Sequence, residues 1–264
     1  MYSTLLTNLE NGIFTITINR PDKLNALNEE VFNDLDKAVD EVYANPDIKT
    51  AIITGAGPKA FVAGADITGF AGLDKSQAMA LAKRGQDVFF KIENSKKPIV
   101  AAVNGFALGG GCELAMCCHF RLCSDNAKFG QPEVNLGLIP GYGGTQRLTQ
   151  LVGKGRSMEL QMTARLIGAA DALAFGLVNQ VTTPETLLEK TKEILAAIQS
   201  KAPVAIGKVI ECINVAALSD SAFTHGKSGY DIEVEAFGDC FITEDMKEGT
   251  AAFLEKRKAE FKGK

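Results

Sequence analysis

The chain has 264 residues, of which 46% are hydrophobic, and its formal net charge at pH 7 is −4. This length is sufficient for one large core, or for one domain with an appendage. An acidic balance without a basic block argues against nucleic acid as the main partner. No apolar run approaches the roughly 18 residues that a membrane-spanning helix needs, and the N-terminus carries no signal or transit pattern. We therefore expect a cytoplasmic protein that does not act at a membrane.

The six cysteines do not form a metal-binding pattern. None is spaced as C-x-x-C, and the cluster Cys117-Cys118-His119 falls at the end of an apolar helical segment. Zinc ligands usually come in closely spaced pairs within loops. We expect reduced, buried thiols and no metal site.

The first half of the chain indicates a hairpin followed by alternating strands and helices. Asn11-Gly12 is typical of a two-residue hairpin turn. Asn28 precedes a helical pattern with an apolar stripe and two glutamates in its first turn. The expected strands are residues 4–9, 13–19 and 50–54, and the expected helices are 29–44 and 75–94.

The second half predicts one further strand at 120–124 and then mostly helices. Ala202-Pro203 marks a candidate boundary, and the chain has no internal sequence repeat. The pattern predicts an α/β fold, with a core at residues 1–200 and a helical region at residues 201–264. Besides a short strand-like insert at 176–181, the expected helices are 150–163, 170–175, 184–197, 204–218, 231–241 and 244–261.

The stretch from Pro98 to Leu114 combines a buried strand, four glycines within seven positions and the start of a helix. The first N–H groups of a helix lack intrahelical partners, and glycine allows a ligand to approach the backbone closely. The spacing fits neither a dinucleotide loop nor a phosphate loop. Glu113, in the first helical turn, is either an acid–base group or an acid that favours the helix dipole. Tight packing is an equally good explanation of the glycines.

Two further segments carry candidate functional groups. Pro132 restricts the backbone just before Glu133, which holds a carboxylate in a loop, although a solvated acid is the default interpretation. Ala63 to Ile67 form a small-residue turn, in which Asp66 is placed to cap the following segment. Two carboxylates beside glycine-rich turns favour paired acid–base chemistry.

Taken together, these motifs resemble the crotonase, or enoyl-CoA hydratase/isomerase, superfamily, and most closely its short-chain enoyl-CoA hydratases. The resemblance covers essentially the whole chain, and the order and spacing of the motifs make it specific. Its segments are Asn19-Arg-Pro, Asn25-Ala-Leu, residues 63–67, 104–114, 129–133, 139–141, 143–147, 174–178, 244–249 and 253–257. At position 119, where relatives commonly have Asp, this chain has His, which we interpret as structural.

The resemblance implies a crotonase spiral of repeated ββα units, followed by a C-terminal helical trimerisation region. It also implies a homotrimer or a homohexamer built as a dimer of trimers. The implied site has Glu113 and Glu133 as catalytic acids, the N–H groups of Ala65 and Gly110 as the oxyanion hole, and a CoA-binding region. The CoA-binding residues would be Lys23, Ala63, Ala65, Asp66, Ile67 and Gly110, with Lys256 from a neighbouring subunit.

The implied reaction is the reversible addition of water to a short-chain trans-2-enoyl-CoA such as crotonyl-CoA. One carboxylate, mainly Glu113, would activate the water and Glu133 would protonate Cα, with both holding the same water. Such an addition needs no metal or cofactor, because CoA is part of the substrate. A Δ3,Δ2-enoyl-CoA isomerase is the alternative within the family, and a non-catalytic CoA-binding scaffold is the alternative outside enzymes. Fatty-acid β-oxidation, butyrate metabolism and aromatic degradation all use the hydration step.

Overall fold

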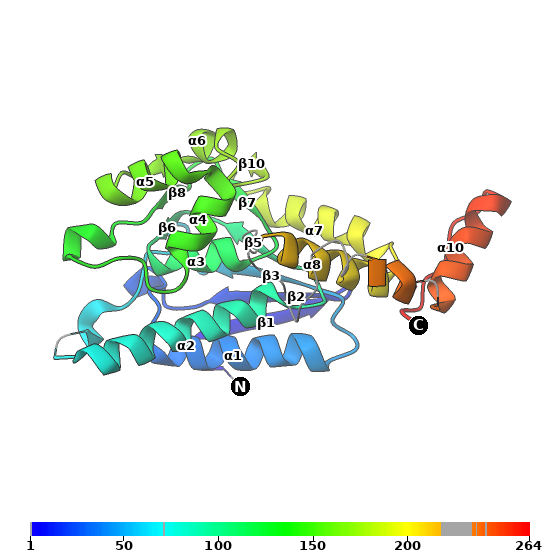
Figure 1. Ribbon diagram of the computed structural model, residues 1–264, viewed down its shortest axis with the longest axis horizontal. Helices are drawn as coiled ribbons and strands as arrows, with labels where there is room; N and C mark the ends of the chain where they lie inside the picture. The colour runs from blue at the N-terminus through cyan, green and yellow to red at the C-terminus, as the bar shows by residue number, and fades with distance from the viewer. Residues whose placement is uncertain (1, 71, 218–233, 236, 241) are drawn as a thin grey trace.

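The structure, a computed structural model, describes residues 2–70, 72–217, 234–235, 237–240 and 242–264. Strands in these residues form two sheets, and helices cover the larger sheet on both sides (Figure 1). The larger sheet has six strands in the order β1-β2-β3-β5-β7-β10. These strands are β1 Leu5–Glu10, β2 Ile13–Ile18, β3 Thr50–Gly55, β5 Ile99–Val103, β7 Phe120–Ser124 and β10 Gln180–Thr182.

The expected hairpin forms the edge of this sheet. β1 and β2 are antiparallel around Asn11-Gly12, whereas every later pair in the sheet is parallel, with Ile16 opposite Ile53 and Ile53 opposite Ala101. All residues of β3 and β5 are buried. Continuous apolar strands of this kind are typical of parallel sheets that are covered on both faces.

The second sheet contains four short strands in the order β4-β6-β8-β9. A strand of this sheet follows β3, β5 and β7 in turn, and each such pair is followed by a helix. The chain therefore repeats a ββα unit and steps from one sheet to the other, which confirms the expected crotonase spiral. The elements are β4 Ala60–Val62, β6 Phe106–Leu108, β8 Lys128–Gly130, β9 Ile167–Gly168, α2 Lys75–Glu93, α3 Gly110–Cys117 and α4 Gly144–Val152.

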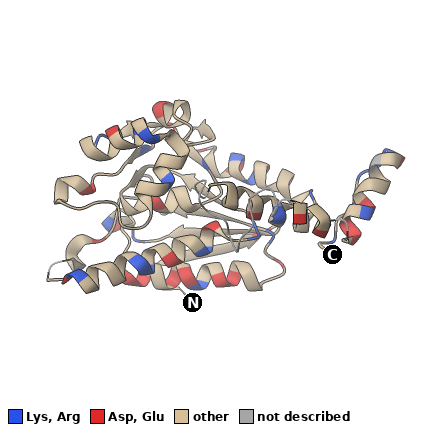
Figure 2. Ribbon diagram, in the orientation of Figure 1, with Lys and Arg blue, Asp and Glu red and all other residues tan. Residues whose placement is uncertain are grey.

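Helices α1 and α2 pack side by side over one face of the larger sheet. α1, Glu29–Ala44, starts at Asn28, whose side chain accepts a hydrogen bond from the Val31 N–H. Its expected apolar stripe is buried. On the exposed side, the Lys91 ammonium of α2 lies 2.7 Å from carboxylates of both Asp36 and Asp40. Acidic residues are frequent along α1 (Figure 2). Such pairs add little stability at an exposed surface, so the buried stripe is what holds α1 in place.

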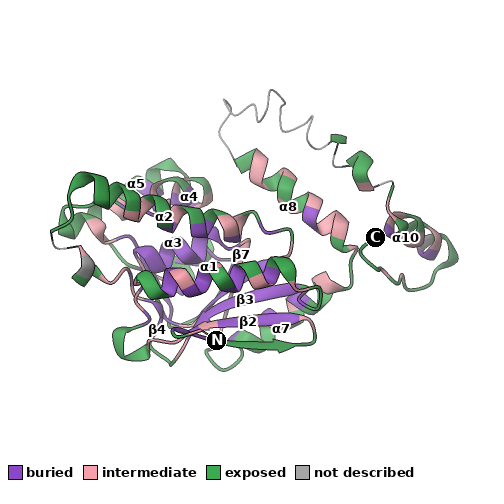
Figure 3. Cartoon of the chain, turned by 90° about the horizontal axis from the view of Figure 1, so that it is seen from below, coloured by how far each residue is buried: buried purple, intermediate pink, exposed green. Residues whose placement is uncertain are grey.

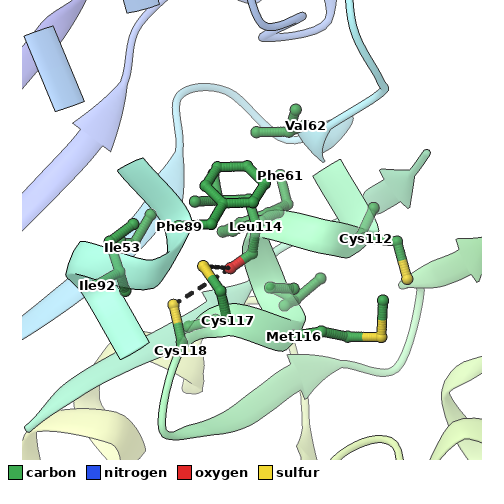
Figure 4. Packing of buried hydrophobic residues seen from close by; sticks show 14 of the residues in the cluster. Ile53, Phe61, Val62, Phe89, Ile92, Cys112, Leu114, Met116, Cys117 and Cys118 are labelled. Carbon is green, nitrogen blue, oxygen red and sulfur yellow. Dashed lines mark hydrogen bonds between the residues drawn. The ribbon is translucent and has the colours of Figure 1, made fainter. Parts of the chain in front are cut away.

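Buried residues concentrate in the strands and in α3 (Figure 3). All eight residues of α3 are buried, and Leu114 of this helix lies in one buried cluster with Phe61 and Phe89 (Figure 4). The Cys117 and Cys118 thiols donate to the Leu114 carbonyl at 3.1 and 3.4 Å. Four cysteines are buried as expected, but Cys212 and Cys240 are only half-buried, so the expectation was wrong for these two.

Some element predictions were incomplete or wrong. Strand β6 lies inside the glycine-rich stretch that we expected to lead directly from strand to helix; three residues are too few to show an alternating pattern. The helix expected at 150–163 is two helices, α4 and α5 Lys154–Thr163, divided at Gly153 with φ +82°. On α2, Ala78 is exposed and the burial begins only at Gly85.

The last third of the described chain is helical. α7 buries Leu187 and Leu195 against Val100 and Leu122, on the opposite face of the larger sheet from α1. α10 lies apart from the sheets, at one end of the molecule (Figures 1 and 3), and ends at Glu255 rather than near residue 261. Of the helix expected at 231–241, residues 231–233, 236 and 241 fall outside the described residues. The helices are α6 Ala169–Ala174, α7 Leu187–Gln199, α8 Pro203–Ala217 and α10 Glu244–Glu255.

Candidate active site

The small-residue turn after β4 is held by a short parallel pairing with residues 24–27. The Ala63 N–H donates to the Leu24 carbonyl, the Leu27 N–H to the Gly64 carbonyl and the Asp66 N–H to the Leu27 carbonyl, at 2.7–3.0 Å. Ala65 bridges Leu27 in this pairing. In this parallel pairing Leu27 makes both hydrogen bonds, so the N–H of Ala65 points away from residues 24–27. It has no acceptor among the described residues. It is available to a ligand.

A second N–H without an intrahelical acceptor lies at the start of α3. Gly109 precedes the helix with φ +49° and ψ −125°, a conformation that glycine adopts readily. Its own N–H donates to the Gly130 carbonyl at 2.9 Å. Gly110 is the first residue of the helix, so its N–H has no intrahelical acceptor.

Gly109 brings three segments together. A Cβ built on it would lie 2.7 Å from Oε1 of Glu133 and 3.9 Å from the Cα of Gly64. The turn after β4, the start of α3 and the Glu133 carboxylate therefore meet at one point. A residue larger than glycine at position 109 would both strain the backbone and displace the carboxylate.

Glu113 lies one turn into α3 and is only 1% exposed. Its Oε1 accepts hydrogen bonds from the Tyr142 N–H at 2.8 Å and the Gly144 N–H at 2.7 Å. Burial raises the pKa of Glu113 to about 7, and the nearby Glu133 carboxylate adds to this, whereas the two N–H donors and the Arg147 charge lower it. This carboxyl can therefore exchange a proton near neutral pH.

Glu133 begins a single 3-10 turn, Glu133–Leu136, directly after Pro132. It is half-buried, and burial raises its pKa. Gln131 is 1% exposed, and with its amide oriented to satisfy both groups it donates to both carboxylate oxygens at 3.1 Å. The two glutamates therefore sit in different environments, one held by backbone N–H groups and the other by a side-chain amide.

The remaining expected site residues fall into two groups. Ala63, Ala65, Asp66 and Ile67 lie on the turn beside the glutamates; Ile67 is 50% exposed, and Asp66 caps the following turn through Thr68 and pairs with Arg20 at 3.1 Å. Lys23 is exposed one residue before the segment that pairs with this turn. Lys256 follows α10, at the other end of the molecule from α3, so it does not reach this site within the same chain (Figure 1).

Sequence reasoning assigned no role to Gln131 or Arg147, which both contact the site, and gave Tyr142 no contact with Glu113. Gln131 and Arg147 lie within motifs that carried the family resemblance, and Tyr142 lies between two such motifs, so the sequence did contain a signal. Two cavities, of about 600 Å³ and about 1310 Å³, are lined by α8 together with α4 and the end of α2. Neither is lined by Glu113 or Glu133, although Arg147 lines both.

Comparisons with known proteins agree with this fold. The family model described as enoyl-CoA hydratase/isomerase matches residues 8–264. The chain is 48% identical over 260 residues to a crotonyl-CoA hydratase of Syntrophomonas wolfei, covering 98% of each chain. It is 46% identical to a short-chain-enoyl-CoA hydratase of Clostridium acetobutylicum, covering 95% of this chain and 94% of that one. A crystal structure of enoyl-CoA hydratase from Bacillus anthracis superposes with a TM-score of 0.92 at 35% identity, covering 99% and 100% of the two chains. The chain belongs to the enoyl-CoA hydratase/isomerase family.

Proposed function

We propose that this protein is an enoyl-CoA hydratase that reversibly adds water to a short-chain trans-2-enoyl-CoA such as crotonyl-CoA. The relatives that are 46–48% identical carry the names crotonyl-CoA hydratase and short-chain-enoyl-CoA hydratase. The observation that carries the proposal is the meeting of Glu133, Gly109 and Gly64 at one point, with Glu113 one helical turn away. Two carboxylates and two N–H groups that have no acceptor among the described residues are what a hydration of this kind requires.

The N–H groups of Ala65 and Gly110 act as the oxyanion hole. Addition of water at Cβ moves negative charge onto the thioester oxygen, and two donors directed at that oxygen stabilise the enolate-like state. The loss of one such donor typically costs about 10²–10³ in rate. The dipole of α3 favours negative charge at the same place.

Glu113 and Glu133 act in different protonation states on one water molecule. Ionised Glu113 takes a proton from the water as its oxygen bonds to Cβ, and protonated Glu133 gives its proton to Cα. A proton passing from Glu113 back to Glu133 restores the pair for the next turnover. Close carboxylates in a desolvated site favour such a shared proton, and their titration belongs to the pair.

The rest of the assignment follows the same proposal. The turn from Ala63 to Ile67 binds the adenine end of CoA, and Lys23, with Lys256 of a neighbouring subunit, lies near its phosphates. The position of Lys256 at the far end of the molecule is consistent with a contribution to a neighbour's site. The protein is a homotrimer or homohexamer that works in the cytoplasm, and it needs no cofactor besides the CoA of its substrate. In the described residues, no helix is both long and apolar enough to cross a membrane.

Hydration of crotonyl-CoA, followed by the loss of the conjugated thioester absorbance, tests the proposal. We expect turnover by the wild type and a fall in kcat of about 10²–10⁴-fold for Glu133→Gln, because the acid that protonates Cα is lost. Glu159→Gln, which removes an exposed carboxylate of α5, is the matched control and should leave kcat unchanged.

Other outcomes would contradict parts of the assignment. Unchanged activity in Glu133→Gln would exclude this residue as the acid. Turnover of a 3-enoyl-CoA without hydration of a 2-enoyl-CoA would indicate an isomerase, and binding of CoA esters without any turnover would indicate a scaffold.

A further inference from the structure

Arg147 of α4 is a buried charge, only 6% exposed, whose donors are directed at two partners. Its Nε and Nη2 donate to the two carboxylate oxygens of Glu93 at 3.0 and 2.8 Å, and its Nη1 donates to the Tyr142 carbonyl at 2.9 Å. A two-pronged contact with a carboxylate fixes the plane of a guanidinium. The position of Nη1 is therefore determined by Glu93.

The peptide segment that Arg147 holds is the one that binds Glu113. Tyr142 and Gly144 donate their N–H groups to Oε1 of Glu113, while the Tyr142 carbonyl faces the guanidinium. Gly143 has φ +102°, and a Cβ built on it would lie 2.3 Å from Nη1 of Arg147. The guanidinium thus packs directly against the turn, on the side away from the glutamate.

Glu93 is itself anchored at the end of α2. Its backbone carbonyl lies 3.2 Å from Nε2 of His119 and accepts from the Asn214 amide of α8 at 2.7 Å. The other ring nitrogen of His119 accepts from the Ile99 N–H, so Nε2 carries the hydrogen. Burial lowers the pKa of His119 and keeps it neutral. The carbonyl of Glu93 is therefore held by the His119 ring and by α8.

We propose that Arg147 is a positioning residue for the hydration step, which holds the Tyr142–Gly144 turn against Glu113 and favours the ionised, water-activating form of that carboxylate. This inference rests on the proposed function. The charged and titratable groups that face Glu113 are Glu133 from its 3-10 turn, Tyr142, Arg147 and the neighbouring Cys112 thiol. Among these groups Arg147 is the positive charge, so its removal leaves Glu113 facing the Glu133 carboxylate alone.

The experiment compares Arg147→Gln, Arg147→Lys and Glu93→Gln with the wild type. In Arg147→Gln we expect kcat for crotonyl-CoA to fall about 10²-fold with KM changed less than about threefold, because the catalytic carboxylate is displaced while the CoA-binding turn is untouched. We also expect the midpoint of the pH profile of kcat to rise by about one pH unit, since the positive charge near the Glu113 carboxylate is lost.

The other variants distinguish the effect of the positive charge from the effect of the two-pronged contact with Glu93. Lysine keeps the charge but cannot form the two-pronged contact, so Arg147→Lys should retain the wild-type midpoint and still lose kcat. Glu93→Gln should also lower kcat, by a smaller factor than Arg147→Gln does. The matched control is Arg165→Gln, which removes an exposed ion pair between Arg165 and Glu159 of α5 and should change neither kcat nor the midpoint. Circular dichroism at the assay temperature must show each variant to be folded.

Three results would overturn the inference: a kcat for Arg147→Gln within about threefold of the wild type, an unchanged midpoint, or an equal loss in Arg165→Gln. The infrared carboxyl band that is absent in Glu113→Gln belongs to Glu113. Titration of this band gives the midpoint of Glu113 ionisation without any need for turnover. If the wild type hydrates no enoyl-CoA, the proposed function fails, and this titration still decides whether Arg147 acts on Glu113.

Discussion

At the scale of single residues, the site distinguishes two chemically identical side chains by their surroundings. Glu113 is almost completely buried and accepts two backbone N–H groups on one oxygen, whereas Glu133 is half-buried and contacts the Gln131 amide. Burial raises both pKa values. At Glu133 its own backbone N–H opposes this rise, whereas at Glu113 two N–H groups of a neighbouring turn and a buried arginine oppose it. Environments that differ in this way allow one acid and one base to coexist.

The raised pKa of Glu113 predicts a pH-dependent gain in stability for Glu113→Gln. Because its pKa is about 7 in the folded chain against an ordinary value of 4.5, the folded protein binds this proton more tightly than the unfolded chain does. The stability that this proton contributes is fully present below pH 4.5 and is lost as the pH rises to about 7.

Glutamine keeps an oxygen for both N–H groups and cannot ionise. The free energy of unfolding of Glu113→Gln, relative to that of the wild type, should therefore rise between pH 4.5 and 7 and level off above pH 7. The total rise should be on the order of 3 kcal/mol at most. Denaturant unfolding at pH 5, 6, 7 and 8 measures the difference. A difference that does not vary with pH would contradict the raised pKa.

At the scale of elements, short strands and glycine breaks position the site. β6 and β8 contain three residues each, yet their pairing brings Gly109 and Gly130 into hydrogen-bond contact and so sets the start of α3. The break at Gly153 allows α4 to end and α5 to turn away. Without that break, the continuous helix that the apolar pattern favours would carry residues 154–163 in another direction.

The break between α4 and α5 predicts that alanine has opposite effects on stability at Gly153 and at Gly155. Gly153 has φ +82° and ψ 157°, a conformation essentially restricted to glycine, and open space around it, so Gly153→Ala should destabilise the protein by about 1–3 kcal/mol through backbone strain alone. Gly155 lies in α5, also in open space and with an ordinary helical conformation, so Gly155→Ala should stabilise it by about 0.5–1 kcal/mol. Thermal unfolding of both variants checks the pair, and equal effects would show that α4 and α5 are not separated in this way.

At the scale of the whole molecule, the C-terminal helices leave apolar side chains uncovered by the described chain. Val209 and Ile213 of α8 are 56% and 62% exposed, and Leu254 of α10 is 74% exposed. Clustered apolar exposure of this kind is typical of surfaces that another chain covers. It supports the proposed trimer or hexamer, in which the tail of one subunit packs on another.

This proposal predicts that a charge on α8 weakens assembly. Three or six chains of 28.1 kDa give about 84 or 169 kDa by light scattering. Ile213→Glu should lower this mass at micromolar concentration, since an apolar contact is replaced by a desolvated charge. Leu173→Glu on α6, where the side chain is 45% exposed, is the control and should keep the wild-type mass. A mass of about 28 kDa for the wild type would exclude the assembly.

The sequence by itself determined the features that depend on local chemistry. The Asn11-Gly12 hairpin, the Asn28 cap, the buried strand at 50–54 and the apolar stripe of α1 all arise from neighbouring residues, and the structure has them where expected. The motifs, through their order and spacing, also indicated the family and both glutamates. No repeat was visible in the sequence, because each ββα unit fills its place with different residues.

Only the tertiary structure decided which groups act together. Strands as short as β6 and β8 gain their hydrogen bonds from partners distant in sequence, so no local pattern predicts them. The partners of Glu113 lie about thirty residues away, in a turn that Arg147 holds through Glu93 of another helix. A pKa depends on burial and on charges brought close by folding. The sequence could therefore name the two acids, and the fold had to give them their different environments.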